Sequence, residues 1–297
     1  MARTSISDVP GKTYVGHPCL VNGEIDWALE TMIIPHSAAR MATHDLLAGV
    51  QGMKPVTPKK AKLLQGWYKD YYLSYVMHHH DNEEKLYFPF LNEVLRKKGV
   101  DPTPNKMSVQ HGELVAAMAK IESGIAELVM KANQDTVAAN VLADQLARTV
   151  ENFTRDMFLH LNEEELFIVP AIRDHVPPEE NDAMVQKIIQ SLGLGGAKLS
   201  IPWIYEALEM YDPTPEKKHL AAFWAVIPPP LKFFNWVNWH AARHEQSRRD
   251  QSAGGRHHRR NGSRFLQLRT GLSCQIQDST FKSRMQQCAE NTRTSAD

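Results

Sequence analysis

The chain has 297 residues, of which 42% are hydrophobic and 23% are charged, and its formal net charge is zero. This composition is typical of a soluble globular protein with one or two domains, and it gives no overall attraction to nucleic acids or anionic membranes. The three cysteines, Cys19, Cys274 and Cys288, lie far apart without CxxC spacing. They therefore predict neither a disulfide framework nor a zinc–cysteine site.

The N-terminal residues 1–24 are expected to form an extended arm, because prolines and glycines interrupt them. They lack the apolar core of a signal peptide. No run of about 18 apolar residues follows anywhere in the chain, so we expect no transmembrane segment. These features predict an intracellular, cytoplasmic protein.

Four segments carry apolar residues at steps of three or four, the periodicity of amphipathic helices. They cover residues 27–50, 58–98, 106–132 and 135–174. Pro35 predicts a kink or a restart in the first helix. Gly99 is expected to end the second helix, and Asp135 to cap the start of the fourth.

Four long amphipathic helices with short connections predict an all-α fold, an antiparallel four-helix bundle. Sustained β alternation is absent from the sequence. We assign residues 25–175 to this domain and residues 176–250 to a C-terminal helical extension of shorter helices. Residues 251–297 are rich in Gly, Ser, Arg and Gln and are expected to be a disordered tail.

Two stretches, "HHHDNEEKLYFP" and "HLNEEELFIVP", share the pattern His-x-x-x-Glu-Glu-x-x-x-x-Pro. His160 and Glu164 in the second copy lie 81 residues after His79 and Glu83 in the first. Residues four apart share one helix face, with Cβ atoms about 5–6 Å apart. Apolar flanks place this face inward, where a charge is costly unless it is paired or binds a metal. The alternative is that both pairs lie on helix surfaces.

The first copy has three consecutive histidines, but the second has only His160. The match selects His79 as the predicted ligand, with His78 exposed. His80, which has Glu84 four residues later, is the local alternative. Glu84 and its counterpart Glu165 are expected to lie around the ligands or on the surface.

Each copy is preceded by a helix that starts an inward stripe with a histidine, His36 or His111. His44, about 80° around the helix from His36, is an alternative ligand, and core or capping roles are alternatives for His36 and His111. The predicted set is His36, His79, Glu83, His111, His160 and Glu164. Nitrogen and carboxylate ligands suit Fe, Mn or Zn, and two converging halves suit a dinuclear site.

Over about residues 25–175, these motifs resemble the hemerythrin-like, or HHE cation-binding, domain family. The resemblance implies a four-helix bundle with a non-heme di-iron centre that is open to dioxygen. It implies the six residues above as ligands, with two irons per chain bridged by Glu83 and Glu164. Oxygen-carrying members have a further histidine four residues after the third-helix ligand. Here that position is Val115, which argues against a dedicated oxygen carrier.

We therefore expect a di-iron-binding protein that binds dioxygen or a related small molecule for sensing or iron handling. One alternative is a di-iron oxidase or peroxidase. Another is a metal-stabilised helical interaction module, with a protein partner bound through residues 200–245. The basic tail is expected to have no nucleic-acid role, because it lacks interleaved aromatic residues.

Overall fold

The structure is a computed structural model that describes residues 17–214 and 216–232. Secondary structure in these residues is helical, apart from one isolated β-bridge between Val21 and Glu24. The predicted all-α class is therefore confirmed. The expected tail, residues 251–297, lies outside the described residues, as do the first sixteen residues of the arm and residues 233–250 of the extension.

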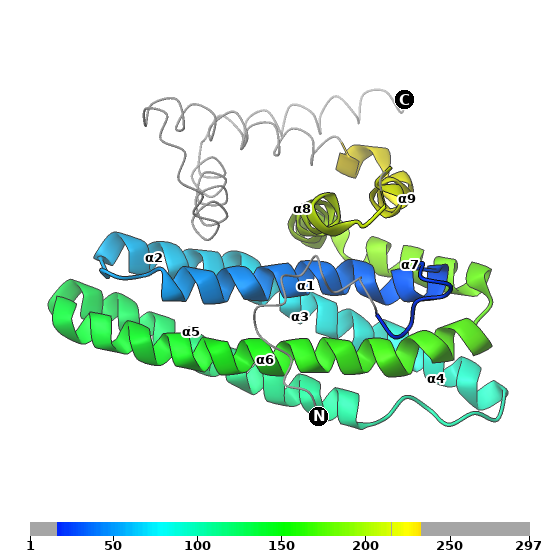
Figure 1. Cartoon of the computed structure of the whole chain (residues 1–297), viewed down its shortest axis with the longest axis horizontal. Coiled ribbons are helices and arrows are strands. Elements are labelled where there is room, and N and C mark those ends of the chain that lie inside the picture. Colours follow the sequence, from blue (N-terminus) through cyan, green and yellow to red (C-terminus); the bar gives the residue numbers. More distant parts are fainter. Residues whose placement is uncertain (1–16, 215, 233–297) are drawn as a thin grey trace, which may run out of the picture. The chain divides into compact units, whose positions relative to one another are not determined.

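Four helical columns lie side by side and form the bundle (Figure 1). The first column is α1 (Trp27–Gln51), the third is α5 (Lys106–Gln134) and the fourth is α6 (Thr136–His175). The second column comprises α2 (Pro58–Trp67), η2 (Tyr68–Leu73), α3 (Ser74–Asn82), η3 (Glu83–Tyr87) and α4 (Phe88–Lys97). Helix α6 packs against both α1 and α5, and α2 packs against α5, so the columns enclose a common core.

Capping residues mark the helix ends, and Asp135 and Gly99 are the two that the sequence predicts. The Asp26 carboxylate accepts a hydrogen bond from the Leu29 amide, and Asp135 accepts from two amides at the start of α6. Gly99 follows α4 with φ of +69°, a left-handed conformation that glycine adopts without strain. Helix α1 continues through Pro35, so the restart that this proline could have caused does not occur, and buried residues lie on both sides of it.

The second column contains two π-helical turns, η2 and η3, within an otherwise continuous helix. Each inserts an extra residue into the helical repeat, and such turns are frequent at functional sites. Glu83 is the first residue of η3. The second motif copy lies in α6, which has no such turn, so the two copies differ in backbone although their residue spacing is the same.

Three further helices cover one side of the bundle: α7 (Pro178–Ser191), α8 (Gly193–Tyr211) and α9 (Lys218–Val226) (Figure 1). Helix α8 packs against α1 and α3. The buried Trp203 ring stacks on Tyr75 at 5.4 Å and on Trp67 at 6.0 Å between ring centroids. Along the described residues, no helix is both long and apolar enough to cross a membrane.

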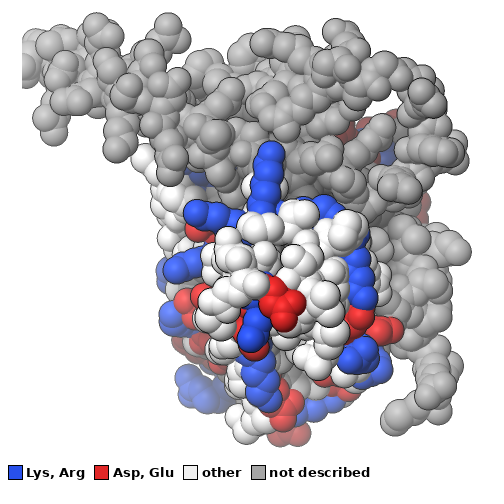
Figure 2. Space-filling model, turned by 90° about the vertical axis from the view of Figure 1, so that its left-hand side faces the viewer, with Lys and Arg blue, Asp and Glu red and all other residues white. Residues whose placement is uncertain are grey.

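Charged residues of both signs are interspersed on the end of the bundle that Figure 2 shows, and neither sign forms a continuous patch there. Exposed ion pairs such as Lys54 with Asp144 and Lys97 with Glu93 join residues of opposite charge. Pairs of this kind contribute only about 0–1 kcal/mol each. The fold therefore depends on its core far more than on its surface charges.

Candidate metal centre

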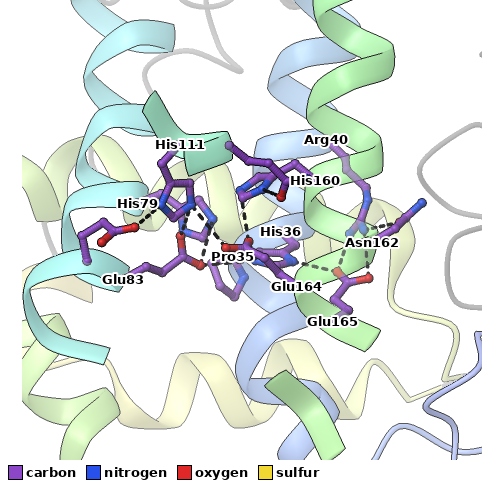
Figure 3. Close-up of polar contacts among 12 residues, drawn as sticks. Pro35, His36, Arg40, His79, Glu83, His111, His160, Asn162, Glu164 and Glu165 are labelled. Atoms are coloured by element: carbon purple, nitrogen blue, oxygen red, sulfur yellow. Dashed lines mark hydrogen bonds and ion pairs between the residues drawn. The ribbon is translucent and has the colours of Figure 1, made fainter. Parts of the chain in front are cut away.

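The structure brings the six sequence-predicted residues together in the middle of the bundle (Figure 3). His36 comes from α1, His79 from α3, and Glu83 from the start of η3. His111 comes from α5, and His160 and Glu164 come from α6. All six are buried, with exposed fractions from 0% to 8%.

Their donor atoms form overlapping groups in which all atoms lie within 4.8 Å of one another. One group is His36, His79 and Glu83, and another is Glu83, His111 and Glu164. A third group adds a residue outside the predicted set, since it joins His111 and His160 to His80. The cluster thus has two ends, each rich in imidazoles.

Glu83 and Glu164 lie between the two ends. Glu83 Oε1 is 3.5 Å from the Nε2 atoms of His36 and His79, and its Oε2 is 3.6 Å from His111 Nε2. Glu164 Oε2 is 3.3 Å from His160 Nε2, and its Oε1 is 3.2 Å from His111 Nε2. Glu164 Oε2 is also 3.5 Å from His36 Nε2, so each carboxylate contacts histidines from both halves of the repeat.

His80, the local alternative to His79 in the sequence, is also buried within the cluster, with 3% of its surface exposed. Its ring stacks on His111 at 4.3 Å and meets His160 edge-on at 5.5 Å. Successive helical residues point about 100° apart. His79 and His80 therefore lie on either side of the inward-facing line of α3, and they belong to opposite ends of the cluster.

Many polar atoms that face the centre have no hydrogen-bond partner within the described part of the chain. They are Nε2 of His79, both ring nitrogens of His80, Oε2 of Glu83, Nε2 of His111, Nε2 of His160 and both carboxylate oxygens of Glu164. Each buried polar atom left in this way costs about 1–3 kcal/mol. Metal ions would satisfy them together, so this donor set fits a metal centre.

Three of the histidines are oriented by a hydrogen bond that their Nδ1 atom donates. His36 Nδ1 donates to Glu165 at 2.8 Å, and His111 Nδ1 donates to Glu84 at 2.6 Å. His160 Nδ1 donates to the Gln110 side-chain oxygen at 3.1 Å. A proton on Nδ1 leaves Nε2 as the electron-pair donor directed at the centre, which is the usual support of a metal-binding histidine.

Glu165 is completely buried and lies in a polar network behind His36 (Figure 3). The guanidinium of Arg40 donates to both carboxylate oxygens, at 2.7 and 2.9 Å, and also to Asn162 at 2.7 Å. His17 Nε2 donates to Glu165 Oε2 at 3.0 Å. Burial favours the neutral acid, but Arg40 and the two histidines hold the pKa of Glu165 well below its ordinary value.

Burial opposes charge throughout the centre, yet two histidines retain a proton. Hydrogen bonds to Glu165 and Glu83 outweigh burial and raise the pKa of His36 to about 9. Contacts with Glu164 and Glu83 likewise outweigh burial and raise the pKa of His111 to about 9. Both imidazoles are therefore cationic at neutral pH before a metal binds.

The other imidazoles are neutral. Burial and neighbouring cationic histidines lower the pKa values of His79 and His80 well below the ordinary value. Burial lowers the pKa of His160 to about 3, against the smaller opposing effect of Glu164. Burial, together with the charge of Glu164, raises the pKa of Glu83 to about 7. Three imidazoles are thus already in the form that binds metal.

The remaining histidines of the sequence analysis lie elsewhere. His44 is only partly buried and belongs to none of the donor groups in the described residues, and His78 is exposed, as predicted. Val115 is 38% exposed, so this position of α5 does not face the centre. His80 from α3 adds a third imidazole to the group of His111 and His160.

Sequence reasoning missed the roles of His80, Arg40 and Gln110. The acidic doublets were a usable signal, since Glu84 and Glu165 follow the two motif glutamates directly and both hold histidines. No sequence motif marked Arg40, because its partner Glu165 lies 125 residues away.

Residues 28–172 match a family model described as "Hemerythrin HHE cation binding domain". The match spans α1 to most of α6 and includes every residue of the donor groups. No curated protein and no solved structure shows a significant match to the chain.

Proposed function

We propose that the chain, whose residues 28–172 match the hemerythrin HHE cation-binding domain, binds two iron ions and, through them, dioxygen or a related small molecule. The proposed role is sensing or iron handling. Iron in this setting supplies a redox-active centre that can take a small molecule as a ligand.

The observation that carries the proposal is the buried set of unpartnered imidazole nitrogens and carboxylate oxygens facing one another. Such a set suits Fe, Mn or Zn, and among these only iron and manganese change oxidation state readily. We assign His36 and His79 to one ion, and His80, His111 and His160 to the other. Glu83 and Glu164 would complete the set as ligands shared by the two ions.

Other residues of the chain orient these ligands. Glu165, Glu84 and Gln110 keep the Nδ1 protons of three histidines, so that each Nε2 faces the ions. The surrounding core leaves little room for water, since all seven ligand residues are at least 92% buried. A dry site with fixed ligands favours the binding of a small, weakly polar molecule over its displacement by water.

The test is metal analysis of the purified chain loaded with ferrous iron, followed by optical spectra under argon and then in air. We expect about two irons per chain and an oxygen-dependent charge-transfer band. His160→Ala should lose iron and the band, while His44→Ala, a matched histidine change outside the donor groups, should keep both. Binding of zinc alone, or of no metal, would contradict the proposal.

A second candidate is an enzyme in which the same centre oxidises an organic substrate. A cavity of about 360 Å³ is lined in part by His79 and Glu83, and dioxygen alone does not require this space. Turnover of peroxide or of an organic reductant by the iron-loaded chain, abolished in His160→Ala, would favour this candidate.

A further inference from the structure

A cavity of about 360 Å³ lies outside the bundle core, between the α1–α3 side of the bundle and the C-terminal helices. Helix α1 contributes one face to its wall, with residues spaced three or four apart. The α1 residues in the wall are Trp27, Glu30, Thr31, Met32, Ile34 and Pro35. The opposite face of α1 packs into the core, so α1 separates the cavity from most of the bundle interior.

The inner end of the cavity reaches the candidate metal centre. His79 and Glu83 belong both to the cavity wall and to one donor group with His36. They face the cavity beside Tyr87 and Tyr75, between α1 and the second column. A molecule in the cavity would therefore lie against two candidate ligands rather than on a distant surface.

Helices α7, α8 and α9 supply the outer wall, which is largely apolar. Val185 and Ile189 come from α7, Ile204 from α8, and Phe223 from α9. These helices follow the matched HHE segment, which ends at residue 172. Helices α7, α8 and α9 thus add a largely apolar wall to a partly open cavity that reaches the centre.

The polar groups on the wall are mostly engaged with the protein. The Glu30 carboxylate accepts from His219 Nδ1 at 2.7 Å. The Asn181 amide accepts from the Tyr87 hydroxyl and donates to Thr31, each at 2.8 Å. Few polar contacts therefore remain for a ligand.

The charge on the wall disfavours an anionic ligand. Glu30 and Asp182 line the cavity, and the wall includes neither lysine nor arginine. A carboxylate or sulfonate would lie near these acids without a lysine or arginine to pair with. A neutral molecule carries no such cost.

We propose that this cavity binds a neutral, largely apolar organic molecule, with one end against His79 and Glu83, as a substrate or effector of the metal centre. The volume falls within the roughly 300–1,000 Å³ of small-molecule sites. The link to the metal rests on the proposed function, whereas ligand binding itself does not.

The test uses two fluorescent dyes that share one aromatic skeleton. N-phenyl-1-naphthylamine is neutral, and 1-anilinonaphthalene-8-sulfonate adds one negative charge. We expect the full chain, free of metal, to bind the neutral dye with micromolar affinity and the sulfonate at least about tenfold more weakly. Equal or stronger binding of the sulfonate would overturn the proposal, as would no binding of the neutral dye.

Two variants fill the cavity from different helices: Ile204→Trp on α8 and Ile189→Trp on α7. Each should reduce neutral-dye binding at least about tenfold. Val141→Trp is the matched control, because Val141 is 55% exposed on α6 and lies outside the cavity wall. Binding that persists in both cavity variants would place the dye elsewhere and overturn the proposal.

A second measurement needs no variant. Loading the unsubstituted chain with ferrous iron should quench the bound dye, because the dye lies beside His79 and Glu83. Unchanged dye fluorescence in an iron-loaded chain would overturn the proposed position. A chain that took up no metal but still bound the dye would contradict the proposed function and would leave the proposed cavity site supported.

Discussion

His80 and His111 stack with their ring centroids 4.3 Å apart, although they come from α3 and α5, in opposite halves of the repeat. The contact gives the His111–His160 end of the centre a third imidazole. Helix α5 supplies no second histidine, because the expected position is occupied by Val115, which is also 38% exposed. His80 thus restores from a neighbouring helix the histidine that the α5 position lacks.

The first prediction concerns the histidine run. His80→Ala should lower bound iron by about one equivalent per chain, because His80 forms a donor group with His111 and His160 and its ring nitrogens have no hydrogen-bond partner among the described residues. His78→Ala is the matched control and should keep the full metal content, since His78 is exposed. Metal analysis of the two purified variants decides the matter, and equal iron in both would remove His80 from the ligand set.

The second prediction concerns the support of His111. Glu84→Ala should weaken metal binding about 10–100-fold, because it removes the acceptor of the His111 Nδ1 proton. The fold should tolerate the change, since the Glu84 side chain is 35% exposed. Glu113→Ala, an exposed acid on the same α5 helix as His111, is the control. Metal titration should leave that control unchanged, and a similar loss in both variants would indicate a general charge effect.

The third prediction concerns the buried ion pair behind His36. Arg40→Ala should lower the free energy of unfolding by about 3 kcal/mol or more, because it leaves the Glu165 carboxylate buried without its guanidinium partner. Lys54→Ala breaks the exposed pair with Asp144 and should cost at most about 1 kcal/mol. Urea unfolding of the metal-free variants gives both values. Equal losses would mean that burial does not set the strength of these pairs.

The fourth prediction concerns pH. His36 and His111 have pKa values raised from 6.5 to about 9, so both hold a proton at neutral pH and must lose it to bind a metal. Metal affinity should therefore rise as pH increases through neutrality and level off above about 9. Competition titrations with zinc, which has no redox chemistry, measure this directly. Affinity independent of pH across this window would contradict protonation of the two histidines.

Much of the bundle follows from local sequence signals. Asp26, Asp135 and Gly99 act at helix ends through contacts within a few residues, so their effects are visible in the sequence. The repeat also identified His79, because the offset of 81 residues pairs it with His160.

The missed features depend on contacts between distant segments. His80 has no counterpart in α6, so the repeat gave no reason to place it inward. Its position depends on how α3, bounded by η2 and η3, is rotated against α5. The cavity likewise depends on α7 to α9 packing onto α1, and helical periodicity does not specify that docking.

The acidic doublets have a consequence for the repeat as a whole. Glu84 belongs to the first copy but holds His111 of the second half, whereas Glu165 belongs to the second copy and holds His36 of the first. The two halves are therefore interlocked, because each completes the other's histidine support. Neither hairpin is a self-sufficient half-site, and a chain divided at the α4–α5 loop would yield two incomplete pieces rather than two mononuclear centres.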